Sequence, residues 1–417
     1  MTACGLDFGT SNSAIGVMRG DVPTLAPVEG SATVIPSAVF FEHGSNGRVM
    51  FGSEAIAAYI GQHDGRLMRA LKSILSTSLI DEKTALGNRK VPLTEVVEIF
   101  VRHLKEKAEA FAETELTAVV HGRPVHFVDG DAAADAKAQA VLERIAHKVG
   151  FRDLVFVYEP IAAAYHYERT VRAEETVLIA DIGGGTSDFT VIRVGPQRSL
   201  QADRTADILA NGGARIGGTD FDALFNLDAV MPILGLGTQL IEKNLPMPRN
   251  LYSELAAWPT INFTYTFRNE RLVLELIEGA REPEKVARLL KVIRERLGHR
   301  IAITVEDAKI ALSEAEKTIL PLDFIETALE ATGTRAGFDH AIAEKTERLR
   351  KVAAACIAEA GLTPSDIDTV FFTGGSGRVP AVRKAILRAA PDARATEGSD
   401  FLSVALGLTR EAQKRFG

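Results

Sequence analysis

Two segments of the sequence combine the residue types that bind phosphate groups. Each places a carboxylate before glycines and polar side chains: Asp7 before Gly9, Thr10, Ser11 and Asn12, and Asp181 before Gly183, Gly184, Gly185 and Thr186. Glycine leaves backbone N–H groups open to an anion, and hydroxyl groups add hydrogen-bond donors. A carboxylate that ends a buried strand is costly unless something pairs with it. The pattern therefore predicts a phosphate site with a metal ion beside the acid.

Both segments lie between apolar runs that predict a strand, a turn and a second strand. Ile15 and Val17 resume the apolar pattern after the first turn, and Phe189 and Val191 resume it after the second. A plain glycine-rich hairpin would account for either segment alone. Two segments of one plan instead predict a duplicated fold whose halves face each other and grip one polyphosphate. Neither segment has the Gly-x-x-x-x-Gly-Lys-Ser/Thr pattern of a Walker-type loop.

The composition is that of a soluble protein with more than one domain. The chain has 417 residues, of which 46% are hydrophobic and 25% charged. No apolar run approaches the roughly 18 residues of a membrane span, and no secretory signal pattern is present. We therefore expect a cytoplasmic protein that binds no membrane. A formal net charge of −7 argues against nucleic acid as a partner. Cys4 and Cys356 are expected to be buried thiols.

Strands and helices alternate along the chain, which predicts an α/β protein. We expect one lobe over residues 1–170 and a second over residues 171–417. Small inserted subdomains are expected over residues 37–112 and 223–305. The second of these holds a stripe of Leu289, Ile293 and Leu297. This stripe indicates either a partner-docking helix or, more often in such patterns, a helix that packs one face on its own core.

Six segments together are similar to one known family. They are "GLDFGTSNS", "YEPIAAA", "DIGGGTSD", "RIGGTDFD", "EDAKIALS" and "FFTGGSGRVP", and they follow the family's order over nearly the whole chain. The sequence resembles the nucleotide-binding domain of the DnaK-like, 70-kDa heat-shock proteins, in the actin and sugar-kinase superfamily. Within the family it is most similar to the short YegD-type bacterial members, which consist of this domain alone.

The resemblance implies an actin-like ATPase fold. Two lobes, each with a ribonuclease-H-like mixed sheet, would hold ATP or ADP and a magnesium ion in a central cleft. The implied catalytic residues are Asp7, Glu159, Asp181, Thr186 and Asp188. Among them, Asp7 and Asp181 would hold the magnesium ion through its waters, and the other three would lie near the attacking water.

The resemblance also assigns the nucleotide contacts. The two glycine-containing loops described above would bind the phosphates. The implied adenosine contacts are Gly217, Gly218, Glu306, Lys309, Ser313, Gly374, Gly375, Ser376 and Arg378. Glu306, Lys309 and Ser313 recur at helical spacing on one face, a pattern that an ordinary amphipathic helix would also show.

Two positions depart from the family pattern. The family lysine that reaches the γ-phosphate is expected near Ile56, but the segment from Phe51 to Ile60 has no basic residue. Lys72 aligns with a different family lysine, so we expect slow hydrolysis unless Lys72, Arg66 or Arg69 takes over. In addition, Ile310 stands where the family has an arginine that stacks on adenine. We also expect no peptide-binding domain, since the sequence ends in a helical tail.

The sequence thus predicts a DnaK-like chaperone-family protein that binds ATP with magnesium and hydrolyses it slowly. Besides nucleotide, we expect a protein client or co-chaperone of unassigned identity. Two other functions stay open. One is a kinase for sugars or other small molecules from the same superfamily, and the other is an actin-like filament or scaffold protein. The segment "YEPIAAA" favours the chaperone branch over the kinases.

Overall fold

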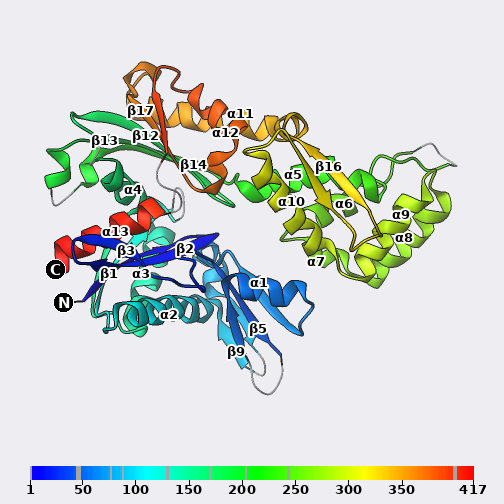
Figure 1. The fold of residues 1–417 in the computed structure, drawn as a ribbon, viewed down its shortest axis with the longest axis horizontal. Helices are drawn as coiled ribbons and strands as arrows, with labels where there is room; N and C mark the ends of the chain where they lie inside the picture. Colours follow the sequence, from blue (N-terminus) through cyan, green and yellow to red (C-terminus); the bar gives the residue numbers. More distant parts are fainter. Residues whose placement is uncertain are drawn as a thin grey trace.

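Two mixed sheets of the same strand order form the centre of the protein (Figure 1). The computed structural model describes residues 2–43, 48–75, 78–86, 89–127, 131–168, 171–201, 204–241, 245–397 and 402–417. The N-terminal sheet has the order β11-β10-β1-β2-β3, and the C-terminal sheet has the order β14-β13-β12-β17-β18. Each middle strand, β1 or β12, is antiparallel to its hairpin partner and parallel to its other neighbour. This ribonuclease-H-like order confirms the predicted actin-like α/β fold class.

The strands of the two sheets come from distant parts of the chain. The N-terminal sheet contains β1 (Ala3–Phe8), β2 (Asn12–Arg19), β3 (Val22–Leu25), β10 (Ala118–Arg123) and β11 (Asp153–Tyr158), with β4 (Ile35–Pro36) paired to β2. The C-terminal sheet contains β12 (Glu175–Ile182), β13 (Ser187–Val194), β14 (Ile208–Ala214), β17 (Thr369–Thr373) and β18 (Arg394–Glu397). The β-branched and aliphatic residues of β12 are buried, which explains why this run forms a middle strand.

Helices bury the faces of both sheets. The helices α2 (Leu93–Ala112) and α3 (Ala132–Lys148) share an apolar core with β1 and β2. The C-terminal sheet packs on α11 (Arg335–Glu359), which in turn packs on α12 (Pro380–Leu387). A third apolar cluster joins the two sheets through α4 (Glu159–Tyr167) and α13 (Leu402–Phe416). Cys4 and Cys356 are buried free thiols, as expected.

The last helix lies against the first strands rather than against the C-terminal sheet. Although the sequence analysis assigned residues 402–416 to the second lobe, α13 packs on β1, β2, β10 and α4. Close contact is possible because glycine has no Cβ atom at two positions. A Cβ on Gly5 would lie 2.2 Å from the backbone nitrogen of Thr409, and one on Gly407 would lie 2.0 Å from the carbonyl oxygen of Ala162. The lobe boundary near residue 170 itself stays a prediction.

Two smaller groups of elements extend from the sheets. The first insertion, residues 38–92, contains β5 (Ala38–Glu42), β6 (Val49–Phe51), α1 (Gly52–Ile60), β7 (Gly65–Arg69), η1 (Leu71–Ile74), η2 (Ser78–Asp81), β8 (Lys83–Leu86) and β9 (Arg89–Pro92). The predicted insertion reaches residue 112 and so includes α2, whose Val97, Phe100 and Leu104 are buried with Phe8 of the N-terminal sheet. Its bounds stay a prediction.

The second insertion, residues 231–312, is helical. After α5 (Gly218–Ala229) it contains η5 (Met231–Leu234), α6 (Arg249–Ala256), α7 (Ile261–Thr264), α8 (Phe267–Gly279), α9 (Pro283–Arg294) and α10 (Gly298–Leu312). The hairpin of β15 (Lys317–Pro321) and β16 (Glu330–Thr334) follows. Leu289, Ile293 and Leu297 are buried, so this stripe packs on the protein's own core. Within the described ranges, no helix is both long and apolar enough to cross a bilayer.

Replacing Gly407 with alanine should destabilise the protein, even though alanine is the better helix former. Helix propensity alone favours alanine by roughly 0.8–1.0 kcal/mol. The new methyl group would overlap the backbone of α4, and overpacking of this kind costs about 1–3 kcal/mol or more. We therefore expect a lower midpoint in urea unfolding. In the matched control Gly279→Ala, the nearest atom would lie 3.7 Å away, and stability should be kept or increased. An unchanged midpoint for Gly407→Ala would contradict the packing of α13 on α4.

Candidate functional site

The turns of the two predicted hairpins meet between the sheets. Asp7 lies near the end of β1 and Asp181 near the end of β12, each just before its turn. A Cβ on Gly184 in the second turn would lie 2.1 Å from the Oγ atom of Ser11 in the first turn. The second turn therefore needs glycine where it touches Ser11 of the first, and two segments distant in the sequence form one surface.

Loops from the C-terminal half of the chain support the second turn. The Gly183 carbonyl accepts hydrogen bonds from the Gly218 N–H at 3.0 Å and from the Ser376 hydroxyl at 3.2 Å. The Gly184 carbonyl accepts one from the Thr219 N–H at 2.7 Å. A Cβ on Gly185 would meet no atom within 4 Å, so the tip of this turn faces open space. The turn is thus held from behind and open in front, as an anion site requires.

A serine that the sequence analysis did not single out supports the first turn. The Ser37 N–H donates to the Ser11 carbonyl at 2.8 Å, and its hydroxyl donates to the Gly9 carbonyl at 2.7 Å. The hydroxyl groups of Ser37 and Ser13 are 2.9 Å apart. Nothing in the local pattern around Ser37 distinguishes it from a loop serine. Only the pairing of β4 with β2 brings it to the turn.

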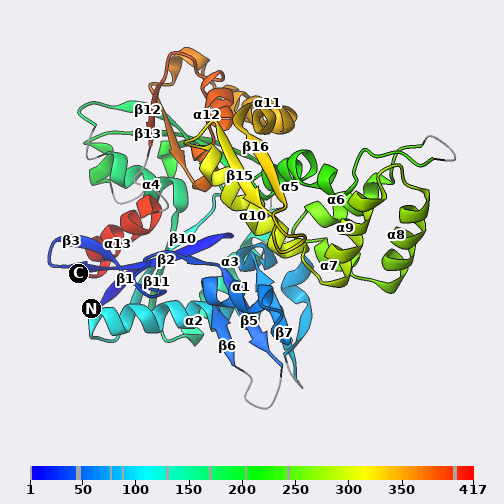
Figure 2. The ribbon, with the colours of Figure 1, turned by 45° about the vertical axis from the view of Figure 1, so that its right-hand side comes forward.

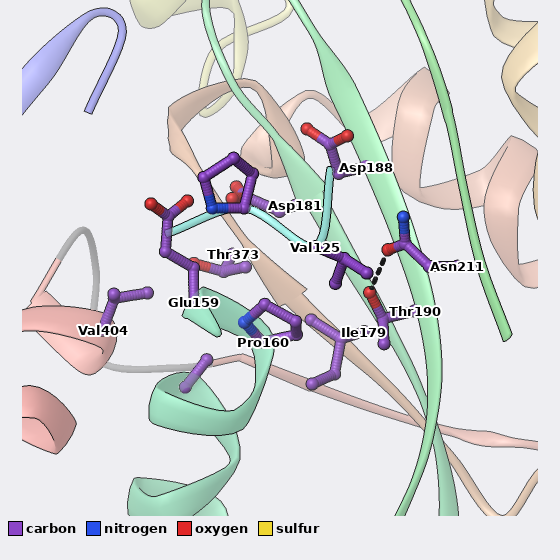
Figure 3. Close-up of a pocket in the computed structure, with 12 residues that line it drawn as sticks. Val125, Glu159, Pro160, Ile179, Asp181, Asp188, Thr190, Asn211, Thr373 and Val404 are labelled. Carbon is purple, nitrogen blue, oxygen red and sulfur yellow. Dashed lines mark hydrogen bonds between the residues drawn. The ribbon is translucent and has the colours of Figure 1, made fainter. Parts of the chain in front are cut away.

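Carboxylates gather below the two turns. Asp181 lies opposite Asp188 in the β12–β13 pairing, and Glu159 approaches from the start of α4 (Figure 3). Burial and the neighbouring carboxylates of Glu159 and Asp181 raise the pKa of Asp7 to about 8. Burial, Asp188 and Glu159 likewise raise the pKa of Asp181 to about 7. A surplus of negative charge is a fitting environment for a cation.

Lys72, one of the three residues that could replace the missing family lysine, lies beside these carboxylates. The ammonium group of Lys72 lies 2.5 Å from Oε1 of Glu159, and the two side chains are only 9% and 15% exposed. Burial acts to lower the pKa of Lys72, but Glu159 and Asp7 outweigh it and raise that pKa. Motif spacing pointed to residues 51–60, which form α1. Strand β7 then runs back along β5 and brings η1, with Lys72, into the cleft.

The predicted adenosine contacts come together beside the second turn. The Lys309 ammonium group lies 2.8 Å from Oδ1 of Asp222, and both side chains are largely buried. Burial raises the pKa of Asp222 to about 6, with Lys309 acting against the shift and Glu306 acting with it. A Cβ on Gly218 would lie 3.3 Å from Nζ of Lys309 and 2.5 Å from Oγ of Ser376. The backbone of Gly217 and Gly218 therefore approaches two of the predicted contacts.

Other predicted residues lie at the margin of this group. Ser313 follows the last residue of α10, and its hydroxyl donates to the Lys309 carbonyl at 3.4 Å. Gly374 has a φ of 77°, and a Cβ there would lie 2.6 Å from Oδ1 of Asp181. Thr186, Asp188 and Arg378 are exposed, and Ile310 is 60% exposed. The structure thus connects the glycine loops to Asp181 and leaves the outer rim to solvent.

The donor set fits a magnesium ion held through water. Asp7 and Asp181 supply two carboxylates near one another, and Asp181 is among the charges that raise the pKa of Asp7. Among the described residues, no three His, Cys, Asp or Glu side chains form a metal-binding group. Magnesium commonly keeps several waters and takes one or two carboxylates together with substrate phosphates. The two aspartates and the open turns above them suit that mode.

Two ribonuclease-H-like sheets with facing glycine turns define the actin-like ATPase class. A family model described as Hsp70 protein matches residues 3–228 and 281–397, which is most of the sequence. The chain therefore belongs to the Hsp70 family, whose members are ATPases. Residues 229–280, which include α6, α7 and α8, fall between the matched segments. Membership of the YegD-type group stays a prediction.

Asp181→Asn should stabilise the protein in EDTA without nucleotide, because it removes a buried charge from a crowd of carboxylates. We expect a gain in the free energy of unfolding of about 0.5–2 kcal/mol, measured by urea unfolding at pH 7.5. Asp188→Asn is the matched control, and it should gain less because Asp188 is exposed. A variant Asp181→Asn that is less stable than the wild type in EDTA would refute the crowding of charge at this site.

Proposed function

We propose that this protein binds ATP with magnesium between the two sheets and hydrolyses it to ADP and phosphate. The observation that carries the proposal is the meeting of two glycine turns whose preceding aspartates, Asp7 and Asp181, lie near a buried Lys72–Glu159 pair. Membership of the Hsp70 family supports the same conclusion. The turns contribute backbone donors, and the acids contribute a cation site. Lys72 contributes a positive charge, so all three needs of phosphoryl transfer are met.

Each group has a distinct part in the proposed reaction. Asp7 and Asp181 would hold the magnesium ion through its waters, and the ion would neutralise charge on the phosphate oxygens when bound. Lys72 would stabilise the charge that grows on the transferred phosphoryl group. Because Glu159 lies against Lys72, it fixes the ammonium group in place before ATP arrives. In this proposal, Lys72 takes the part of the family lysine that is missing near Ile56.

A small cavity beside the acids favours water as the acceptor. It is lined by Glu159, Asp181, Asp188, Thr190 and Asn211, among others, and the Thr190 hydroxyl donates to Oδ1 of Asn211 at 2.8 Å (Figure 3). It has room for about two water molecules. We propose that Glu159 or Asp188 orients the attacking water here, with the Thr186 hydroxyl nearby.

The second candidate function, a small-molecule kinase, has less support than hydrolysis because the family match is to Hsp70. A filament or scaffold role has no specific observation in its favour. We propose a chaperone-family role in the cytoplasm. The client or co-chaperone has still to be identified by experiment. The adenosine end of the nucleotide would lie against Gly217, Gly218 and Lys309, and against the loop from Gly374 to Arg378. Glu306 and Ser313 are the other two proposed adenosine contacts.

Magnesium-dependent binding of ATP and ADP is the first expected property. A nucleotide at about 100 times its dissociation constant should stabilise the folded state by roughly 2.7 kcal/mol. The measurement is thermal unfolding with ATP or ADP, in magnesium and in EDTA. The shift should shrink in EDTA and should be largely lost in Asp7→Asn. If the unfolding temperature is the same with and without either nucleotide, the proposed function is wrong.

Lys72→Ala should slow hydrolysis much more than it weakens binding. Losing one preorganised donor at the reacting phosphoryl group costs on the order of 100- to 1,000-fold in rate. Single-turnover hydrolysis at saturating ATP measures this effect, and Arg66→Ala, an exposed neighbour on β7, is the control. A Lys72→Ala rate equal to that of the wild type would remove Lys72 from the mechanism. A phosphorylated sugar found with ATP and a panel of sugars would favour the kinase instead.

A further inference from the structure

The first insertion contacts the second insertion through α1. The Tyr59 hydroxyl of α1 donates to Oδ1 of Asn262 in α7 at 2.8 Å, and the Gln62 amide donates to the Glu295 carbonyl at 2.7 Å. The Tyr59 ring packs edge-on against His299, with centroids 4.8 Å apart. Figures 1 and 2 show α1 facing the α7 and α10 side of the second insertion. These contacts hold the insertions together at a distance from the phosphate turns.

Arg69 makes another of these contacts. It is the last residue of β7, and its guanidinium carbon lies 4.2 Å from the centre of the Trp258 ring. The same ring lies edge-on to His299, with centroids 4.7 Å apart. Burial lowers the pKa of Arg69, while the carboxylates of Glu306 and Asp222 act in the opposite direction. The guanidinium group therefore lies in the field of the acids that surround Lys309.

Arg69 and Lys72 belong to one short segment. They are three residues apart, a distance of no more than roughly 11 Å along the chain. Between them, Ala70 has a φ of 54°, a left-handed conformation that alanine rarely adopts. The turn then continues directly into η1, which carries Lys72. Because this turn is short, we expect a displacement of Arg69 to move Lys72 as well.

We propose that Arg69 is a positioning residue for Lys72. When the insertions are closed, Arg69 docks on Trp258 and the segment 69–72 seats the Lys72 ammonium group against Glu159. Closure at the mouth of the cleft and placement of the cation at the phosphates then occur together. The inference rests on the proposed hydrolysis of ATP, and it adds a residue from outside the phosphate site to that reaction.

A double-mutant cycle tests this inference. Single-turnover hydrolysis at saturating ATP is measured for the wild type, Arg69→Ala, Lys72→Ala and the double variant. A 1 Å misplacement of a catalytic group can cost on the order of 100-fold, so we expect a fall of about 10- to 100-fold for Arg69→Ala. Arg69 should have less than about a twofold effect in the Lys72→Ala background, since coupled residues are not additive. Effects that multiply would overturn the inference.

Two further variants separate positioning from misfolding. Arg69→Lys keeps the charge and should recover part of the rate, while Trp258→Leu should reproduce the loss seen in Arg69→Ala. Arg66→Ala is the control on the same strand and should match the wild type. Trp258 is the only tryptophan in the sequence, so its fluorescence reports on the contact directly. ATP should change its emission in the wild type and not in Arg69→Ala.

The outcomes distinguish this inference from the proposed function. A wild type that neither binds nor hydrolyses ATP would refute the proposed function. A wild type that hydrolyses ATP, with Arg69→Ala or Trp258→Leu equally fast, would refute the positioning role alone. An emission change that persists in Arg69→Ala would also overturn it.

Discussion

The structure depends on keeping several carboxylates close together under two glycine turns. Left alone, Asp7, Asp181 and Glu159 would repel one another, and burial raises the pKa of both aspartates. One ammonium group, that of Lys72, offsets part of this charge through its contact with Glu159. The rest of the missing positive charge is what a metal ion and its substrate would supply. Two sheets, rather than one, are needed because each brings only one of the two aspartates.

The two hairpins follow one plan but are not equivalent. In the register of the second hairpin, Asp181 lies opposite Asp188, whereas in the first hairpin Asp7 lies opposite Ala14. The extra acid lies on the side where Glu159 and the small cavity are found. The duplicated fold therefore places two similar turns beside an asymmetric set of acids.

The parts of the site that are formed by neighbouring residues in the sequence were predictable. The parts that depend on contacts between distant segments of the chain were not. Asp7, Asp181 and the glycine turns follow from a strand–turn–strand pattern within about a dozen residues each. The sequence left Lys72, Arg66 and Arg69 as alternatives, because the place of Lys72 depends on β7 running back along β5. Ser37 and the Arg69–Trp258 contact escaped notice because their partners lie far away in the chain. The duplicated sheet order was predictable, but the packing of α13 on β1 was not.

That last helix has a consequence for how the protein is made. Gly5 and Gly16 pair across the first hairpin, and both approach Thr409 of α13. During synthesis, the first hairpin emerges from the ribosome long before residue 409, so α13 cannot cover its glycine face while the residues between them are made. Contacts of such long sequence separation form late and slow the folding of a domain. The first hairpin is therefore completed only when a helix from the far end of this sequence has been made.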